Sequence, residues 1–310
     1  MSQSLAFVFP GQGSQHLGML SELAGEHPII EQTFQEASDS LGLDLWTMAQ
    51  TGPEDALNST ENTQPALLTA GVALWRLWNQ LDGATPSVMA GHSLGEYTAL
   101  VCAGTIDFAD GVRLVRARGQ FMQQAVPAGA GAMAAILGLD DDAVATACAG
   151  AAQGEVVSPV NYNCPGQVVI AGEKAAVERA MAACKEAGAK RAIALPVSVP
   201  SHCELMKPAA EQMAAVLADI ELRMPIIKVV QNVTAAAPTD LDELKANLLS
   251  QLYSPVLWTD SVRNMITCGV TTTLECGPGK VLAGLNKKID RSLTVAAIND
   301  ATGMAKALAL

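Results

Sequence analysis

A serine enclosed by two glycines, between an apolar run and an amphipathic segment, is the feature that most constrains this chain. Ser87 to Ala90 predicts a short buried strand, and Glu96 to Cys102 carries the apolar spacing of a helix. The turn between them reads Gly91-His92-Ser93-Leu94-Gly95. A serine at such a strand-to-helix turn is typical of a nucleophile elbow, which exposes the hydroxyl at a helix N-terminus. A plain glycine-rich turn has the same pattern, so the stretch alone leaves both interpretations open.

The composition argues against several classes of protein. None of the apolar runs in these 310 residues approaches the ~18 residues of a membrane span. Met1 to Pro10 lacks the basic segment of a signal peptide and predicts a buried strand over Leu5 to Phe9. A formal net charge of −12 argues against a nucleic-acid partner. The seven cysteines, without a Cys-x-x-Cys pair, argue against disulfides and against a metal site. We therefore expect a reducing, cytoplasmic location.

A second glycine-rich loop, Pro10-Gly11-Gln12-Gly13-Ser14-Gln15, follows the first predicted strand. Its glycines allow a close approach of the backbone, and its N–H groups are available as donors. The spacing matches neither a P-loop nor a dinucleotide-binding loop. The loop is either an ordinary strand end or the source of a main-chain donor for an oxyanion.

The other elements alternate between strands and helices, which predicts an α/β-hydrolase-like domain around a parallel sheet. The helix expected over residues 64–81 has Thr63 as its N-cap and Pro65 in its first turn. Further helices are expected over 28–41, 107–124, 241–252 and 259–268, and further strands over 226–230, 272–275 and 293–298.

Residues 125–198 form a different pattern, a strand, helix, strand, strand, helix and strand in that order. This is the split βαβ arrangement of ferredoxin-like folds. We expect a ferredoxin-like small domain over 125–198, inserted into a catalytic domain made of 1–124 and 199–310.

Arg118 is an anomaly on the helix expected over residues 107–124. On a helical wheel it lies in the middle of the apolar face formed by Gly111, Leu114, Val115 and Met122. An unpaired buried charge costs several kcal/mol, about 3–5, so the guanidinium needs a partner. That partner is either an internal Asp or Glu or an anionic ligand, and the planar fork suits a carboxylate.

The elbow serine requires a base later in the chain, and His202 is the best candidate. It follows a predicted strand and the Pro200-Ser201 turn, at the edge where open α/β sheets place their sites. Ser93 and His202 together supply a nucleophile and a general base for acyl transfer. No carboxylate stands in a convincing position to orient the imidazole, and a carbonyl near Gln251 is the alternative acceptor. For the oxyanion, elbow geometry offers the N–H of Leu94, and the first glycine-rich loop offers that of Gln12.

Seven motifs, in order over nearly the whole chain, resemble the malonyl-CoA:acyl carrier protein transacylase family of bacterial fatty acid synthesis. Each motif is weak by itself, and the ordered set is specific. They are Phe9-Pro10-Gly11-Gln12-Gly13-Ser14-Gln15, Gln64-Pro65-Ala66, Gly91-His92-Ser93-Leu94-Gly95-Glu96, the Arg118 helix, Asn161-Tyr162-Asn163, Val199-Pro200-Ser201-His202 and Gly277-Pro278-Gly279.

The resemblance implies a ping-pong reaction in which Ser93 takes malonyl from malonyl-CoA and passes it to the phosphopantetheine thiol of acyl carrier protein. It implies that His202 is the base, that Arg118 pairs with the malonyl carboxylate, and that the Gln251 region orients the histidine. The oxyanion hole would be the N–H groups of Gln12 and Leu94.

The same resemblance implies that Asn163 and Gln64 lie in the substrate pocket. The CoA thioester would be a substrate, so no cofactor is expected, and neither a membrane nor a nucleic acid is expected as a partner. We expect a monomer.

One position departs from a related pattern. Malonyl-selective acyltransferase domains of modular polyketide synthases often carry Phe directly before the base, where this chain has Ser201. The small residue makes rejection of a methyl-branched malonyl group less certain.

Acyl carrier proteins are acidic, so docking on this acidic chain would need basic clusters. The dense ones are Lys190 with Arg191, and Lys287 with Lys288 and nearby Arg291. Ordinary solvated charge explains each cluster equally well.

Three other functions remain open. A serine esterase or thioesterase shares the elbow and the base, but it leaves Arg118 unexplained. An acyltransferase that loads a polyketide carrier protein shares the whole set, whereas a non-catalytic scaffold for carrier proteins would need none of it.

Overall fold

Five parallel strands form the larger of two sheets. The computed structural model describes residues 4–197 and 199–310. The strands are β1 (Ser4–Phe9), β2 (Val88–Gly91), β7 (Lys228–Val230), β8 (Val270–Glu275) and β9 (Thr294–Ala297), in the spatial order β7-β2-β1-β8-β9. Every pairing is parallel. The expected parallel sheet is therefore confirmed.

The register of β1 and β2 places the two glycine-rich loops side by side. Phe9 pairs with Gly91, so both strands end at the same edge of the sheet. The N–H of His92 donates to the carbonyl oxygen of Phe9 at 2.9 Å, just beyond the last paired residues. The loop after β1 and the turn after β2 consequently leave the sheet together.

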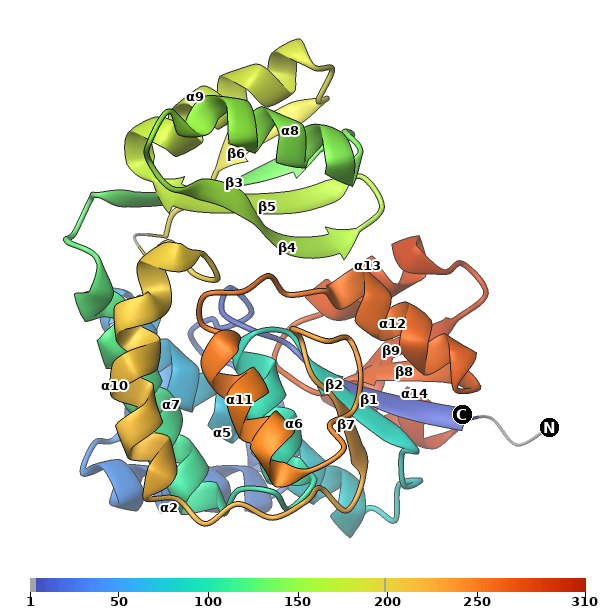
Figure 1. Ribbon diagram of the computed structural model, residues 1–310. Coiled ribbons are helices and arrows are strands. Elements are labelled where there is room, and N and C mark those ends of the chain that lie inside the picture. Colours follow the sequence, from blue (N-terminus) through green and yellow to red (C-terminus); the bar gives the residue numbers. More distant parts are fainter. Residues whose placement is uncertain (1–3, 198) are drawn as a thin grey trace.

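Alternation along β1 divides the core into two layers. Phe7 and Phe9 face one layer, and Ala6 and Val8 face the other. The first layer packs on the helices α2 (Ile29–Leu41), α5 (Thr60–Gln80), α6 (Leu94–Cys102), α7 (Phe108–Ala125), α10 (Lys207–Ala218), α11 (Leu241–Ser250) and α14 (Ala301–Leu308). The second packs on α12 (Trp258–Thr267) and α13 (Val281–Ile289). Figure 1 shows the sheet between these two groups of helices.

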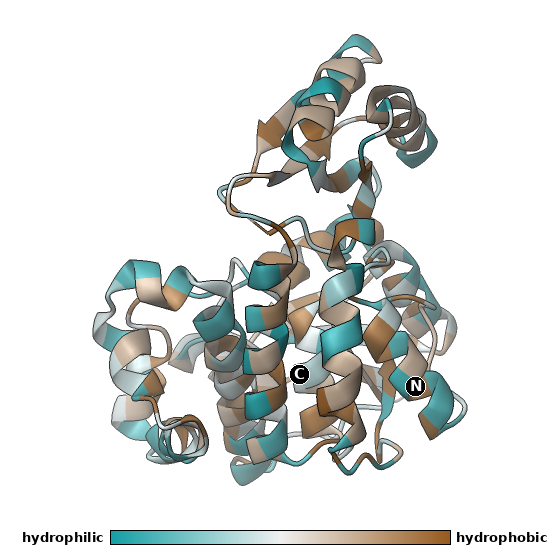
Figure 2. Ribbon diagram, turned by 60° about the vertical axis from the view of Figure 1, so that its left-hand side comes forward, coloured by the Kyte–Doolittle hydropathy of each residue, from teal (hydrophilic) through white to brown (hydrophobic). Residues whose placement is uncertain are grey.

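The short helices were missed in the sequence. They are α1 (Ser21–Glu26), α3 (Leu45–Thr51), α4 (Glu54–Asn58) and α14, whereas the 3-10 turn η1 (Glu204–Met206) leads directly into α10. Each has eight residues or fewer, which is too short for a helical period to stand out. Hydrophilic and hydrophobic residues mix along the longer helices (Figure 2). In residues 4–197 and 199–310, every helix is too short or too polar to cross a membrane.

The start of α5 differs from the prediction. The helix begins at Thr60 with Ser59 at the N-cap, so Thr63 is not a cap and Pro65 lies beyond the first turn. The cause is a contact from another helix, because the N–H of Glu61 donates to Oε1 of Gln123 on α7 at 2.8 Å. A polar first turn that is capped by a distant side chain leaves no periodic signal in the sequence.

The second sheet has four antiparallel strands and lies at the top of Figure 1. Its strands are β3 (Gly131–Leu137), β4 (Val157–Cys164), β5 (Gln167–Glu173) and β6 (Arg191–Ala194), in the order β4-β5-β3-β6. The helices α8 (Asp141–Ala152) and α9 (Lys174–Glu186) cover one face. The predicted order of strands and helices is confirmed. The strand β6 ends at Ala194 rather than at Val197, because Pro196 has no N–H to continue the ladder.

The other face of the four-stranded sheet turns toward the segment that carries the predicted base. Met133 and Val160 pack there with Cys203. The strand β4 is also tied to the five-stranded part, since the N–H of Tyr162 donates to the carbonyl oxygen of Val256 at 3.0 Å and that of Val256 to the carbonyl oxygen of Val160 at 2.8 Å. Of the two predicted boundaries, residue 198 lies outside the described residues.

Gly119 on α7 tests the packing that places Arg118. A Cβ atom there would lie 2.6 Å from Cα of Glu61 and 2.7 Å from the carbonyl oxygen of Thr60, so α5 and α7 touch at this point. We expect Gly119→Ala to lower the free energy of unfolding by about 1–3 kcal/mol, measured by urea denaturation. Gly284→Ala on α13 is the control, because nothing lies within 4 Å of its Cβ position, and it should stabilise by about 0.5–1 kcal/mol. Equal effects of the two changes would contradict this packing.

Candidate active site

The turn that carries Ser93 is strained and closely packed. Ser93 has φ 53° and ψ −111°, between the end of β2 and the start of α6. A Cβ on Gly91 would lie 1.8 Å from the carbonyl carbon of Gly95, and one on Gly95 would lie 2.0 Å from the carbonyl oxygen of Phe9. Neither position accepts a side chain, which explains why glycines enclose the serine.

Asn232 holds this turn from both sides. Its Oδ1 accepts from the N–H of Ser93 at 2.7 Å, and its Nδ2 donates to the carbonyl oxygen of Gly91 at 2.6 Å. Asn232 is fully buried and follows β7, the strand next to β2. A non-glycine residue at positive φ costs about 1–3 kcal/mol, and these two hydrogen bonds offset that strain.

His202 contacts the serine directly. Its Nε2 lies 2.7 Å from Oγ of Ser93, and its Nδ1 lies 2.7 Å from the main-chain oxygen of Gln251. Because a carbonyl only accepts, Nδ1 carries the proton and Nε2 offers a lone pair to the serine hydroxyl. Burial, with the charge of Arg118 as a second cause, lowers the pKa of His202 to about 3. The ring is therefore neutral at physiological pH, which leaves the lone pair of Nε2 free.

Arg118 lies beside the serine with only neutral partners. It is 1% exposed, and its guanidinium donates to Oε1 of Gln64 at 2.9 Å, to Oε1 of Gln251 at 3.0 Å and to Oγ of Ser93 at 3.4 Å. It also lies over the ring of Tyr97, 5.2 Å from the centroid. Among the described residues no carboxylate forms an ion pair with it, and its Nε has no hydrogen-bond partner. A direct ion pair with an internal Asp or Glu, one of the two partners considered from the sequence, is therefore not formed among the described residues.

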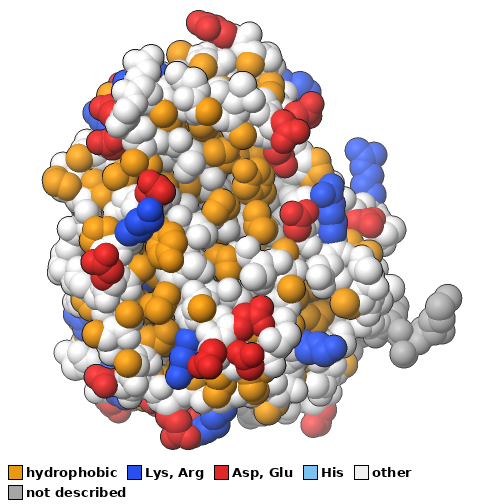
Figure 3. Space-filling model, viewed as in Figure 1, with side chains coloured by type: hydrophobic (Ala, Val, Ile, Leu, Met, Phe, Trp, Pro, Cys, Tyr) orange, Lys and Arg blue, Asp and Glu red, His pale blue; other side chains and the backbone are white. Residues whose placement is uncertain are grey.

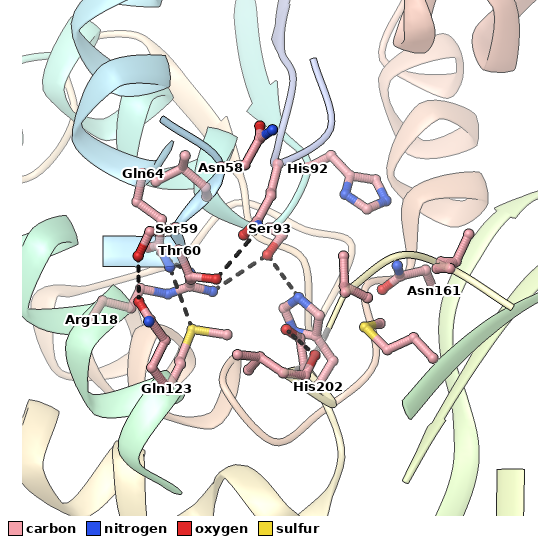
Figure 4. A pocket seen from close by; sticks show the side chains of 18 of the residues that line it. Asn58, Ser59, Thr60, Gln64, His92, Ser93, Arg118, Gln123, Asn161 and His202 are labelled. Carbon is pink, nitrogen blue, oxygen red and sulfur yellow. Dashed lines mark hydrogen bonds between the residues drawn. The ribbon is translucent and has the colours of Figure 1, made fainter. Parts of the chain in front are cut away.

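A cavity of about 230 Å³ connects these groups (Figure 4). The five-stranded part and the segments next to the four-stranded sheet both contribute to its wall. Its lining includes Gln12, Asn58, Ser59, Thr60, Gln64, His92, Ser93, Leu94, Arg118, Met122, Gln123, Met133, Asn161, Leu195, Pro196, Val197, Val199, Ser201 and His202.

The two predicted oxyanion donors meet at this cavity. Gln12 and Leu94 both line it. Gly11 allows the loop to come this close, since a Cβ there would lie 2.7 Å from the carbonyl oxygen of His92. Within the described part of the chain, the N–H groups of Gln12 and Leu94 donate to no protein acceptor. Both N–H groups thus stay candidates for donors to an oxyanion.

The predicted pocket residues divide into two cases. Gln64 lines the cavity and bonds Arg118. Asn163 does not line it, and its Oδ1 instead lies 2.8 Å from Nε2 of His92. Asn161 is the asparagine that faces the cavity, with an Oδ1 that has no partner among the described residues. The cause is an irregular register of β4 on both sides of Asn161, which breaks the alternation expected of a strand.

The four predicted docking residues lie outside the cavity lining. Lys190, Arg191, Lys287 and Lys288 are all exposed. Lys287 is already engaged, since its Nζ donates to the carbonyl oxygens of Arg291 at 2.8 Å and Leu293 at 2.7 Å. Lys288 is the freer charge of that pair.

Sequence reasoning missed three polar residues around the turn. Asn232 and Gln231 follow β7, and Glu96 ends the serine motif, and all three are fully buried. The available signals were the position of Gln231 and Asn232 after a strand and the place of Glu96 in the serine motif. No motif marks a residue that acts on the backbone of a distant turn. In the described residues the seven cysteines are free, and no group of three His, Cys, Asp or Glu side chains is arranged to hold a metal.

Asn232→Ala tests whether the side chain of Asn232 keeps the serine reactive. We expect the rate of Ser93 labelling by a fluorophosphonate to fall about ten-fold or more, because the strained turn loses two hydrogen bonds. Asn286→Ala is the matched control, since Asn286 is equally buried but bonds Trp258 and Thr273. A similar loss of labelling in both variants would show a general effect of stability instead.

Comparison with known proteins identifies the family. The acyl transferase domain family matches residues 6–305. The chain is 62% identical over 305 residues to the malonyl CoA-acyl carrier protein transacylase of Escherichia coli K12, covering 98% of this chain and 99% of that protein. A solved acyl carrier protein S-malonyltransferase from Vibrio cholerae superposes with a TM-score of 0.96 at 60% identity, covering 98% of this chain and 99% of that one. A malonyl-transacylase solved with a type II PKS acyl-carrier protein gives 0.98 at 57% identity, covering 99% of each chain. This chain belongs to the acyl transferase domain family, and within it to the malonyl-CoA:acyl carrier protein transacylases.

Proposed function

We propose that this enzyme transfers malonyl from malonyl-CoA to the phosphopantetheine thiol of acyl carrier protein, in fatty acid synthesis, through an ester on Ser93. The observation that carries the proposal is a buried guanidinium that no anion contacts among the described residues, 3.4 Å from Oγ of the serine that the base contacts. The free carboxylate of a malonyl group would supply the missing charge.

The first half-reaction forms the ester. Nε2 of His202 takes the proton from Oγ of Ser93 as Oγ bonds the thioester carbon. The N–H groups of Gln12 and Leu94 donate to the resulting oxyanion. When the C–S bond breaks, the imidazolium returns its proton to the CoA sulfur. The main-chain oxygen of Gln251 keeps the ring oriented and accepts from its Nδ1 throughout.

The second half-reaction is the reverse with a new thiol. His202 takes the proton of the carrier's thiol, the sulfur attacks the ester carbon, and Oγ of Ser93 leaves with that proton. Both steps use side chains and main-chain donors of this chain, so the proposal needs no cofactor.

Arg118 selects the acyl group. Its planar fork suits a carboxylate, and a bound malonyl group would exchange the neutral partners of the guanidinium for a charged one. An esterase or thioesterase has no need of a buried cation at this point, which is why we favour the transferase.

A second acceptor is a polyketide carrier protein. The observation behind it is the 57% identical transacylase that was solved with a type II PKS acyl-carrier protein.

Ser201, the small residue before the base, lines the cavity. A methyl group is worth only about 1–3 kcal/mol of discrimination, so we propose weak rejection of a methyl-branched malonyl group.

The fold supports a finer classification. We assign the five-stranded part to the α/β-hydrolase-like class, with Ser93 on a nucleophile elbow, and the four-stranded part to the ferredoxin-like class. We place the boundaries of the inserted domain near residues 125 and 198.

We further propose a monomer that acts in the cytoplasm, without a membrane or nucleic-acid partner, in keeping with seven free cysteines and a net charge of −12.

We place the docking of the acidic carrier protein on the two basic clusters. Helix α13, which carries Lys287 and Lys288, packs on β4. Lys190 lies over Gly138, whose neighbour Gly166 belongs to the turn between β4 and β5. Both clusters thus approach the same end of the four-stranded sheet. Figure 3 shows hydrophobic side chains across the middle of one face, with charged ones scattered around them.

Arg118→Ala tests the selection of malonyl. We expect formation of malonyl-enzyme from radiolabelled malonyl-CoA to fall about 100-fold or more, because the carboxylate loses its partner, while loading of acetyl is kept or rises. Arg113→Ala, on the solvent side of the same helix, should change neither rate. Ser93→Ala should load nothing. A retained preference for malonyl in Arg118→Ala would contradict the role given to the guanidinium.

Charge reversal tests the docking surface. We expect Lys190→Glu with Arg191→Glu, and Lys287→Glu with Lys288→Glu, to raise the KM for carrier protein about ten-fold or more. Hydrolysis of malonyl-CoA should hardly change, because the clusters lie outside the cavity lining. Equal losses with both substrates would show that these residues do not dock the carrier.

A further inference from the structure

Glu96 is a buried carboxylate next to the site that the mechanism above does not use. It is the third residue of α6, directly after the serine turn, and it is fully buried. Its Oε2 accepts from the N–H of Asn232 at 2.7 Å and from Nε2 of Gln251 at 3.1 Å, and its Oε1 accepts from Nε2 of Gln231 at 3.1 Å. In the part of the chain that the structure describes, no basic side chain forms an ion pair with it.

The carboxylate and the buried guanidinium share one amide. Arg118 donates to Oε1 of Gln251, and Nε2 of Gln251 donates to Glu96. The carbonyl end of this amide thus faces the cation and its N–H₂ end faces the anion. The two buried charges are opposite in sign and are joined through a dipole that is aligned with both.

This alignment fixes the orientation of Gln251. Turning the amide over would place its N–H₂ group against the guanidinium and its oxygen against the carboxylate, which is unfavourable at both ends. The same Nε2 also donates to the main-chain oxygen of Ser93 at 3.0 Å. The main-chain oxygen of Gln251 in turn accepts from His202. One residue, through its side chain and its main-chain oxygen, therefore connects the anion receptor, the nucleophile and the base.

Glu96 is also linked to Ser93 through Asn232. The N–H of Asn232 is its shortest contact, and the side chain of Asn232 is the group that clamps the strained turn. Loss of the carboxylate would leave the Asn232 N–H without an acceptor, at a cost of about 1–3 kcal/mol, and would remove one of the acceptors of the Gln231 and Gln251 amides.

We propose that Glu96 is the counter-charge of Arg118 and a positioning residue for the dyad of Ser93 and His202. The inference rests on the proposed function of this site. In a hydrolase triad a carboxylate contacts the histidine directly, whereas here the carboxylate acts through Gln251 and Asn232. Its negative charge opposes the effect of Arg118 on the imidazolium that forms as Ser93 attacks. It also weakens the hold of Arg118 on the malonyl carboxylate, so that the acyl group can leave.

Glu96→Gln in the full-length enzyme is the test, because it keeps the size of the side chain and removes the charge. In single-turnover loading of malonyl-CoA we expect the maximal rate to fall about ten- to hundred-fold while the half-saturating concentration stays equal or falls. Loss of the negative charge of Glu96 slows the proton transfer to His202, but it favours binding of the malonyl carboxylate to Arg118. Glu275→Gln is the matched control, since Glu275 is also fully buried but accepts from main-chain N–H groups at the start of α13, among them those of Val281 and Ala283. It should lower the melting temperature and leave both loading parameters unchanged.

Two results would overturn the proposal. A maximal rate within about two-fold of the unaltered enzyme would show that the charge is not needed. A higher half-saturating concentration, with a loss of melting temperature that matches Glu275→Gln, would show a structural role only. If the unaltered enzyme loads no malonyl, the proposed function itself fails, and the two failures are thereby distinguished.

The pH dependence of the unaltered enzyme gives a measurement that needs no variant. Burial raises the pKa of Glu96 to about 7. The charged or titratable groups that face it are Arg118, Tyr97 and, through Gln251, His202. Burial lowers the pKa of His202 to about 3 and raises that of Tyr97 to about 12, so neither titrates near neutrality. We expect loading to slow as the pH falls from about 8 to about 6, because Glu96 then gains a proton. A flat profile over this range would contradict the role of the charge.

Discussion

The burial of Arg118 is the constraint on which the site depends. Removing a guanidinium from water costs several kcal/mol, about 3–5 when no partner compensates, and among the described residues only neutral oxygens contact it. The carbonyl oxygens of Gln64 and Gln251 are held where they partly solvate the charge, and the ring of Tyr97 covers one face. A carboxylate that binds beside the guanidinium would compensate the rest of this cost, which would add to the free energy of binding. Acyl groups without a carboxylate cannot compensate this cost, and the difference is the physical basis of the proposed selectivity.

Close contacts between main-chain segments place the nucleophile Ser93 beside this charge. Gly91, Gly95 and Gly11 lie where a single added carbon would collide with neighbouring backbone. Their absent side chains let the serine turn, the start of α6 and the loop after β1 converge at one edge of the parallel sheet. The four-stranded sheet then contributes the opposite wall, through Met133, Asn161 and the segment after β6. The cavity is thus built from pieces that lie far apart in the chain.

Much of this arrangement could be predicted from residues alone. Ser93, His202, Arg118 and the two main-chain donors follow from local patterns, because strand-to-helix turns and misplaced charges leave clear signals. The errors have a common cause, which is that a distant contact overrides a local pattern. Gln123 caps α5 from another helix, and an irregular register turns Asn161 rather than Asn163 toward the cavity. Asn232 and Glu96 were missed for the same reason, since their partners are backbone groups and amides from elsewhere in the chain.

The acceptor for His202 has a consequence for how the enzyme tolerates mutation. A triad carboxylate is encoded by one codon and is lost by a single substitution. The main-chain oxygen of Gln251 is present whichever residue occupies the position, so no point mutation can remove its chemistry directly. The side chain at the same position is thereby available for a separate task, the orientation of Arg118. Gln251 thus has two contacts that respond differently to mutation. A substitution changes the side-chain contact to Arg118, whereas the main-chain acceptor for His202 is kept.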